Sequence, residues 1–146
     1  MNKHLFFDQL YALIKDEPNK LANLSNITAF LNQSLDDINW VGFYFLDELV
    51  LGPFQGKVAC TRLPIGKGVC GVAAMRNQII RVDNVHEFHG HIACDSASKS
   101  EIVLPIMSNY QLIGVLDIDS PSYNRFTQRD EDILKEVVHI IETVLY

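Results

Sequence analysis

Two strand-like segments joined by a short polar turn constrain the fold of this chain more than any other feature of its sequence. Residues 101–107 and 112–120 are both rich in Ile, Val and Leu, and the turn-forming residues 108–110 separate them. Apolar, β-branched runs on either side of a short polar turn predict a β-hairpin, and therefore an antiparallel sheet. Pro105 also predicts that its strand lies at a sheet edge or contains a bulge, because proline cannot donate a backbone hydrogen bond.

Amphipathic helices are predicted on both sides of this sheet-forming region. Apolar residues recur at helical spacing within residues 5–14 and again within 21–31. Near the C-terminus, Thr127 is a favourable N-cap with Asp130 three residues later, and apolar residues then recur at helical spacing up to Ile141. Because helices precede and follow the strands instead of alternating with them, the order of elements predicts an α+β fold.

The segments between these helices predict further strands, a short helix and a long loop. The aromatic and β-branched run 40–46 predicts a buried strand. Shorter strands are expected at 49–51, 58–60 and 79–82. The first of these is expected to end before Gly52 and Pro53, and residues 63–75 predict a glycine-rich turn followed by a short helix. Residues 83–99 lack periodicity, which predicts a long loop, and long loops in compact domains are often functional.

Composition and charge exclude several classes of protein. The chain has 146 residues, 48% of them hydrophobic, which suffices for the core of a single domain over residues 1–146. Its net charge of -6 and its scattered Lys and Arg argue against a nucleic-acid or anionic-membrane surface. We see no signal peptide and no apolar run long enough to span a membrane. A cytoplasmic protein is therefore expected, and its three cysteines cannot all be paired within one chain.

One cysteine lies in the long loop, downstream of several histidines, and this suggests thiol chemistry. Cys94 follows His86, His89 and His91. A nearby imidazolium would favour the reactive thiolate form of the sulfur. These residues are also metal-ligand types, but their spacing matches no common zinc pattern, so no metal is predicted. Ordinary solvated loop residues are the simpler interpretation of at least two of the histidines.

The other two cysteines leave alternatives open. If Cys94 is oxidised to a sulfenic acid, a second thiol can condense with it to a disulfide, and Cys60 and Cys70 are both candidates for that role. Alternatively, both are small buried apolar residues, because free cysteine is among the most buried residue types. Spacing does not decide between these interpretations, whereas the polar loop favours a redox role for Cys94.

Three acidic and two aromatic residues lie where a ligand pocket could form. Asp117 and Asp119 are two residues apart at a strand end, so they project from the same face, and Glu101 begins the other strand of the hairpin. Buried carboxylates favour a cation such as a ligand ammonium group, and their repulsion would raise one pKa toward a general-acid role. A strand-end turn and an exposed charge are the alternatives. Trp40 and Tyr44 share a strand face that is either core or the apolar wall of a pocket.

Six short motifs occur in order along the chain: WVGFY at 40–44, GPFQG at 52–56, GKGVCG at 66–71, HIACD at 91–95, EIVLP at 101–105 and LDIDS at 116–120. Together they resemble the free methionine-R-sulfoxide reductases, which are small enzymes with a GAF fold. The resemblance implies a single GAF-like domain whose central antiparallel sheet has the N- and C-terminal helices on one face and a ligand pocket on the other. The generic GAF pattern alone would be less specific, because it also covers many ligand sensors.

The resemblance implies that the chain reduces the R epimer of free methionine sulfoxide. Cys94 matches the family's nucleophile, and Cys60 matches the cysteine that forms a disulfide with it. Cys70 matches a third cysteine that assists or relays. No cofactor is expected to be bound, and thioredoxin, with NADPH as its electron source, is the implied external reductant.

The resemblance also assigns the pocket residues. Trp40 and Tyr44 match the aromatic wall around the substrate's methyl group, and the acidic trio matches the cluster that holds the substrate and polarises the sulfoxide. Glu101 and Asp119 are the candidates for protonating the sulfoxide oxygen, and Asp117 for binding. A homodimer is the implied assembly. The competing hypotheses are a GAF sensor that binds a small ligand and a metal-binding module.

Overall fold

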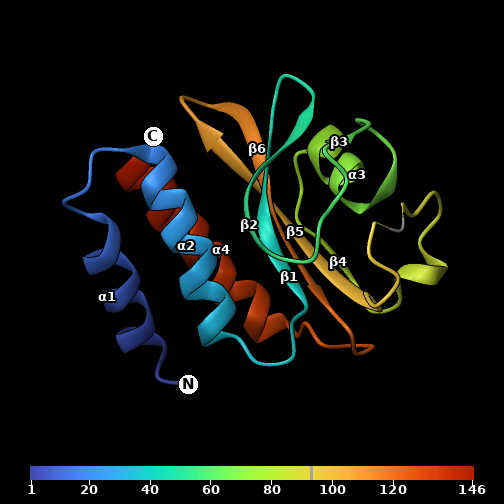
Figure 1. Ribbon diagram of the computed structural model, residues 1–146, viewed down its shortest axis with the longest axis horizontal. Helices are drawn as coiled ribbons and strands as arrows, with labels where there is room; N and C mark the ends of the chain where they lie inside the picture. The colour runs from blue at the N-terminus through green and yellow to red at the C-terminus, as the bar shows by residue number, and fades with distance from the viewer. Residues whose placement is uncertain (93) are drawn as a thin grey trace.

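The computed structural model describes residues 1–92 and 94–146, which form helices and an antiparallel sheet (Figure 1). The helices are α1 (Lys3–Ile14), α2 (Lys20–Ser34), α3 (Gly68–Arg76) and α4 (Gln128–Leu145). The strands are β1 (Trp40–Phe45), β2 (Leu49–Gly56), β3 (Arg62–Leu63), β4 (Ile80–Val82), β5 (Ser100–Ser108) and β6 (Gln111–Ser120). A 3-10 helix, η1 (Val85–Glu87), lies between β4 and β5. Within the described residues, no helix is long and apolar enough to cross a membrane.

The predicted hairpin, β5–β6, is present and lies inside the sheet, whose strand order is β3-β2-β1-β6-β5-β4. Pro105 lies beyond the end of the short edge strand β4, whose last pairing joins Ile80 to Val103. The hairpin register also shifts between Ile106 and Met107, next to the proline. Pro105 therefore occupies a position without a β4 partner and close to a bulge, as its missing N–H predicts.

The two faces of the sheet bury different sets of side chains, because successive strand residues point to opposite sides. α2 and α4 cover one face, with α1 packed on their outer side (Figure 1), and Phe43, Leu104 and Leu116 of this face belong to the larger apolar core. α3 and the loops around it lie on the other face, where Trp40 and Val103 belong to a second cluster. The α+β fold with the terminal helices on one face is thus confirmed.

The start of α4 shows how local sequence defines an element boundary. Thr127 accepts a hydrogen bond from the backbone N–H of Asp130 at its side-chain Oγ1, at 3.2 Å. Its own N–H donates to the Asp130 carboxylate at 2.8 Å, which completes a capping box. Arg125 Nη1 lies 3.0 Å from the same carboxylate. The N-cap predicted from the sequence is therefore the N-cap of the helix.

Two strand predictions were wrong. β2 does not end before Gly52 and Pro53 but continues to Gly56. The two residues lie opposite a single β1 residue, Phe43, and this register shift is a β-bulge. A bulge tolerates a proline, which cannot donate to the ladder. Residues 58–60 are not a strand. The carbonyl of Cys60 accepts a hydrogen bond from a side chain instead of from a neighbouring strand.

Candidate active site

A pocket lies on the sheet face opposite α1, α2 and α4, between β1, β5, β6, the start of α3 and the loop 83–99. Its lining includes most of the residues singled out from the sequence: Trp40, Tyr44, Cys70, Cys94, Glu101, Asp117 and Asp119. Cys60 does not line the pocket itself but is bonded to Cys94. The fold therefore brings together residues that are separated by as much as 79 positions in the chain (Trp40 to Asp119).

The carboxyl groups of this pocket come together through the strand register. Glu101 on β5 lies directly opposite Asp119 on β6, and Asp117 is two residues away on the same face. The three residues are only 6%, 9% and 6% exposed, respectively. Among the described residues, Asp117 Oδ1 is buried without a hydrogen-bond partner. The cluster is therefore a buried group of acids that a bound cation would stabilise.

Burial changes the protonation of these acids. Burial, and next the neighbouring Asp117, raise the pKa of Glu101 well above its usual range. The same two causes raise the pKa of Asp119. Burial raises the pKa of Asp117 as well, although its polar contacts with Glu101, Cys70 and Asp119 act in the opposite direction. Because buried carboxylates this close cannot all be ionised, the cluster retains a proton that it can donate.

An aromatic wall stands beside the acids. The rings of Trp40 and Tyr44 stack with centroids 5.9 Å apart, and the ring of Phe54 also stacks on Trp40, with centroids 5.3 Å apart. Trp40 Nε1 donates to a backbone carbonyl at 3.2 Å, and the Tyr44 hydroxyl donates to the Cys60 carbonyl at 2.9 Å. A Cβ at Gly42 would lie 2.6 Å from the Trp40 ring, so glycine makes room for the indole. With their polar atoms occupied, both rings offer apolar faces to a ligand.

The three cysteines are in two chemical states. Cys60 and Cys94, which are 34 residues apart, form a disulfide that joins the segment before β3 to the loop 83–99. Cys70 on α3 is a buried free thiol and donates to Glu101 Oε2 over 3.9 Å. Burial, and next Asp117, raise the pKa of Cys70 well above its usual value. Cys70 is therefore a neutral thiol beside the acids, whereas Cys94 is bonded to the partner that the resemblance implied.

The first turn of α3 contributes residues to the pocket that the sequence analysis did not identify as site residues. Lys67, Gly68 and Val69 line the pocket, and no side chain caps the helix at Lys67. The first backbone N–H groups of a helix lack partners within the helix and favour an anionic ligand. The glycine-rich turn before a short helix was the available signal. Gly68 has a φ of +70°, which is the left-handed region that favours glycine.

The histidines divide between the pocket and its surroundings. His91 lines the pocket, whereas His86 lies outside its lining with its ring centroid 6.5 Å from that of His91. Burial, and next His86, lower the pKa of His91. Among the described residues, the group that could hold a metal ion is Cys70, Glu101 and Asp117, not the histidines. The loop histidines are therefore not part of the group of possible metal ligands found among the described residues.

Asn39 is a second residue that the sequence analysis missed. Its side-chain amide donates to Asp95 Oδ2 at 3.0 Å and to Ser98 Oγ at 3.1 Å. Its backbone N–H donates to the carbonyl of Asp119 at 2.9 Å. Asn39 thus ties the loop that contains Cys94 to the strands that hold the acids. No local pattern indicates this role, because the partners lie more than fifty residues away in the chain.

Replacing Asn39 with alanine is expected to loosen this loop. The change removes two side-chain hydrogen bonds and should lower the free energy of unfolding by about 1–2 kcal/mol. Hydrogen exchange of the backbone amides at 95–98 should become several-fold faster while exchange in α4 is unchanged. Asn32→Ala, at an exposed position on α2, is the matched control. Equal exchange of residues 95–98 in both variants would contradict the assigned role.

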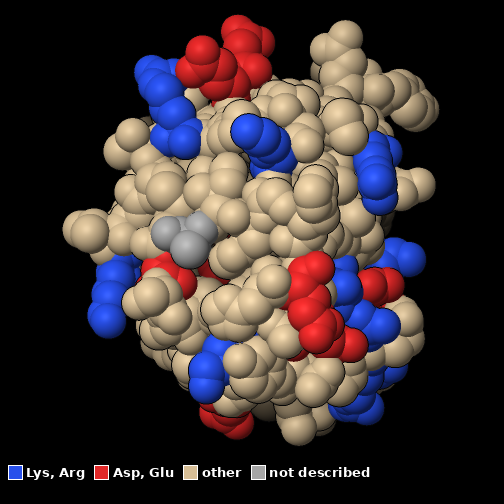
Figure 2. All heavy atoms as spheres, turned by 90° about the vertical axis from the view of Figure 1, so that its right-hand side faces the viewer, with Lys and Arg blue, Asp and Glu red and all other residues tan. Residues whose placement is uncertain are grey.

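The face that carries the pocket has no continuous basic surface among its described residues. Lys and Arg side chains are dispersed over it and lie among acidic side chains (Figure 2). An extended phosphate backbone would need a contiguous basic patch. The pocket face therefore suits a small ligand better than a nucleic acid.

Comparison with known proteins places this site in a family. The GAF domain family matches residues 12–145. The free methionine-R-sulfoxide reductase of Escherichia coli (strain K12) is 55% identical to this chain, over 99% of this chain and 92% of that protein. The chain belongs to the free methionine-R-sulfoxide reductase family. The reductase of the same name from Saccharomyces cerevisiae is also similar, with 41% identity over 97% of this chain and 86% of that protein.

Solved structures of this reductase family share the fold. The fRMsr of Staphylococcus aureus in complex with substrate has a TM-score of 0.94 and 52% identity, and the match covers 99% of this chain and 96% of that chain. The GAF fold and the family expected from the sequence motifs are therefore confirmed.

Proposed function

We propose that this chain is an oxidoreductase that reduces free L-methionine (R)-S-oxide to L-methionine. The observation that carries the proposal is the placement of Cys94, bonded to a second cysteine, on the same pocket as a buried acidic cluster and an aromatic wall. A thiol that cycles through a disulfide supplies two electrons, which is what the reduction of one sulfoxide requires. The name shared by the relatives in Escherichia coli and Saccharomyces cerevisiae supports the same reaction.

The substrate is a small zwitterion, and the pocket offers a partner for each of its parts. The buried Asp117, whose Oδ1 lacks a partner among the described residues, suits the α-ammonium group. The N–H groups at the start of α3, near Gly68, suit the α-carboxylate. The stacked rings of Trp40 and Tyr44 suit the S-methyl group. This orientation directs the sulfoxide sulfur toward Cys94.

The first chemical step transfers the oxygen to the enzyme. The Cys94 thiolate attacks the sulfoxide sulfur, while Glu101 or Asp119 in its protonated form donates a proton to the sulfoxide oxygen. The hydroxyl group leaves the substrate sulfur and adds to the Cys94 sulfur as the S–S bond between enzyme and substrate breaks. Methionine is thereby released, and Cys94 is oxidised to a sulfenic acid. The raised pKa of both carboxyl groups supports this role, because a raised pKa favours the protonated form that can donate.

A second thiol then resolves the sulfenic acid. The Cys60 thiol attacks the sulfur of oxidised Cys94, a water molecule leaves, and a disulfide forms between the two residues. The bond between Cys60 and Cys94 in the structure supports this pairing, and Cys70 supports the site through its contact with Glu101. The dithiol of thioredoxin then reduces the disulfide by exchange and restores both thiols, with NADPH as the source of electrons.

One mass-spectrometric experiment tests the reaction and its epimer. The reduced protein is mixed with one equivalent of racemic free methionine sulfoxide, and the intact protein and its peptides are then analysed. The expected result is loss of two hydrogens, a peptide pair that joins Cys60 to Cys94, and consumption of the R epimer alone. Consumption of both epimers at equal rates would overturn the proposed substrate. Sedimentation of the same protein would measure whether it forms the homodimer that we also propose.

Replacing Cys60 with serine is expected to separate the first turnover from recycling. The variant should still form about one equivalent of methionine, because Cys94 remains, but turnover with thioredoxin should fall by a factor on the order of 10² or more since no Cys60–Cys94 disulfide can form. Thiol quantification and methionine release measure the two effects. Thr61→Ser, at the neighbouring exposed position, is the control and should recycle normally. Unimpaired recycling of the Cys60 variant would remove Cys60 from the resolving role.

A further inference from the structure

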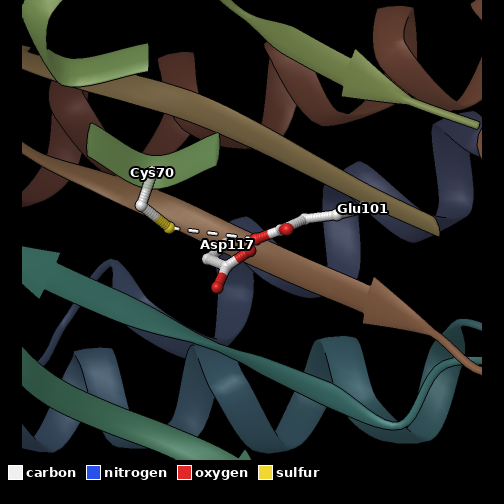
Figure 3. Close-up of side chains that lie close together, drawn as sticks. All are labelled: Cys70, Glu101 and Asp117. Atoms are coloured by element: carbon white, nitrogen blue, oxygen red, sulfur yellow. Dashed lines mark hydrogen bonds between the residues drawn. The ribbon is translucent and has the colours of Figure 1, made fainter. Parts of the chain in front are cut away.

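Cys70, Glu101 and Asp117 form a cluster of ligand atoms that remains available when Cys60 and Cys94 are bonded to each other. The three residues come from α3, β5 and β6 and point toward one another (Figure 3). Their closest potential ligand atoms, one from each residue, all lie within 4.8 Å of one another. The Sγ atom of Cys70 is 3.9 Å from Glu101 Oε2. The cluster faces the pocket, so a solute can reach it.

Among the described residues, no cationic side chain balances the negative charge of this cluster. Asp117 is only 6% exposed, and its Oδ1 has no hydrogen-bond partner. Buried carboxylates of this kind are stabilised by a cation, either a ligand ammonium group or a metal ion. No lysine or arginine lies among these three side chains, and Lys67 on the pocket wall forms no ion pair among the described residues.

We propose that the disulfide form of the protein binds a borderline-soft divalent cation of the Zn²⁺ type through Cys70, Glu101 and Asp117. The metal takes one sulfur and two carboxylate oxygens, and the open pocket leaves room for a water molecule as the fourth ligand. When the metal binds, the Cys70 thiol loses its proton to solvent, and so does a carboxyl group of the pair that holds one.

The separation of Cys70 and Glu101 is compatible with a tetrahedral site. With metal–sulfur and metal–oxygen bonds of about 2.3 and 2.0 Å, adjacent ligand atoms in a tetrahedron lie roughly 3.5 Å apart. The observed separation of 3.9 Å between Cys70 and Glu101 needs only a small side-chain adjustment to reach this value. The thiolate ligand selects Zn²⁺, Co²⁺ or Cd²⁺ over Mg²⁺ and Ca²⁺, which prefer sites made only of oxygen ligands.

Metal binding should compete with substrate binding, and this expectation rests on the proposed function. Asp117 would bind either the metal or the ammonium group of the substrate, but not both at once. The cation is therefore a competitor of free methionine sulfoxide. Because Cys60 and Cys94 are not ligands, this competition does not require either of the redox-active thiols.

The test uses Co²⁺ as a spectroscopic probe and the protein with its Cys60–Cys94 disulfide intact. Because Cys70 is then the free cysteine, a thiolate-to-cobalt charge-transfer band in the near ultraviolet reports its coordination directly. The expected result is a band that saturates at one equivalent of Co²⁺ and that Zn²⁺ abolishes, whereas an excess of Mg²⁺ leaves it unchanged. Absence of the band, or Co²⁺ binding without it, would overturn the proposal.

Matched variants establish which residues bind. Cys70→Ser should lose the band, and Asp117→Asn should weaken Co²⁺ affinity at least tenfold, with circular dichroism confirming that both variants are folded. In the double variant Cys60→Ser/Cys94→Ser, Cys70 is the one remaining cysteine, and the band should be retained. A band of unchanged affinity in Asp117→Asn would overturn the ligand set, as would loss of the band in His91→Ala.

Competition between Co²⁺ and the substrate distinguishes failure of the proposed metal site from failure of the proposed function. Free methionine (R)-sulfoxide should raise the Co²⁺ concentration at half-saturation of the band, whereas N-acetylmethionine sulfoxide should not. A saturable band that the substrate does not affect would leave the metal site in place and contradict only the shared use of Asp117.

Discussion

Replacing Cys94 with serine is expected to abolish reduction of free methionine (R)-sulfoxide, including the first turnover. Serine is nearly isosteric with cysteine, but its hydroxyl does not ionise near neutral pH and cannot stably accept the sulfoxide oxygen. Removing a covalent nucleophile of this kind lowers the rate by a factor on the order of 10⁴–10⁶. The Cys60–Cys94 disulfide is lost in the same variant, because Cys94 is one of its two partners.

The measurement is methionine release in a single turnover, with the protein in excess over the substrate. Ser96→Ala is the control, because Ser96 is exposed on the same loop and should release methionine at the original rate. Substrate binding, measured by calorimetry, should change little in Cys94→Ser. A first turnover at the original rate in this variant would show that another group is the nucleophile.

Acetylating the α-amino group of the substrate is expected to lower kcat/KM on the order of 10⁴-fold. The acetylated compound has no ammonium charge, so the buried carboxylate of Asp117 loses its cation. Sites built around a buried polar contact reject an analogue that lacks it by roughly this factor. The same argument predicts that methionine sulfoxide within a protein chain is a poor substrate, because a peptide bond carries no charge.

The comparison needs two further measurements. The methyl ester of methionine (R)-sulfoxide keeps the ammonium group and loses only the carboxylate charge, so its kcat/KM should fall less than that of the acetylated compound. Asp117→Asn should narrow the difference between free and acetylated substrate, because a neutral amide does not require a cation. Equal kcat/KM values for free and acetylated sulfoxide in the unchanged protein would contradict the assigned role of the acidic cluster.

Elements with strong local signals were predicted correctly. The β5–β6 hairpin follows from two apolar runs and a polar turn, and the start of α4 follows from Thr127 and Asp130. Both depend on interactions between residues close together in the chain, so both can be predicted from short stretches of sequence. The segments 49–51 and 58–60 were misjudged because a bulge and a side-chain hydrogen bond, both involving β1, decide their structure.

The candidate site was predicted in part for a related reason. Asp117 and Asp119 could be assigned to one strand face from their spacing, and Glu101 could be placed near them from the hairpin. Asn39 and the first turn of α3 were missed as site residues. Their importance arises from partners in distant segments, such as Asp95 for Asn39.

The sequence by itself determined the fold class, the hairpin and the residue types available for chemistry, since helix and strand periodicity and capping act over a few residues. Its motifs also indicated the reductase family. Spacing left open whether Cys60 or Cys70 meets Cys94, and the family resemblance implied Cys60. The tertiary structure contains this bond and gives its physical reason. The folded chain buries Cys70 on α3 beside Glu101. It brings Cys60 within bonding distance of Cys94, with 5.6 Å between the Cα atoms of these two cysteines. Contacts between loops depend on how the whole sheet and its covering segments pack, and no local pattern encodes that arrangement.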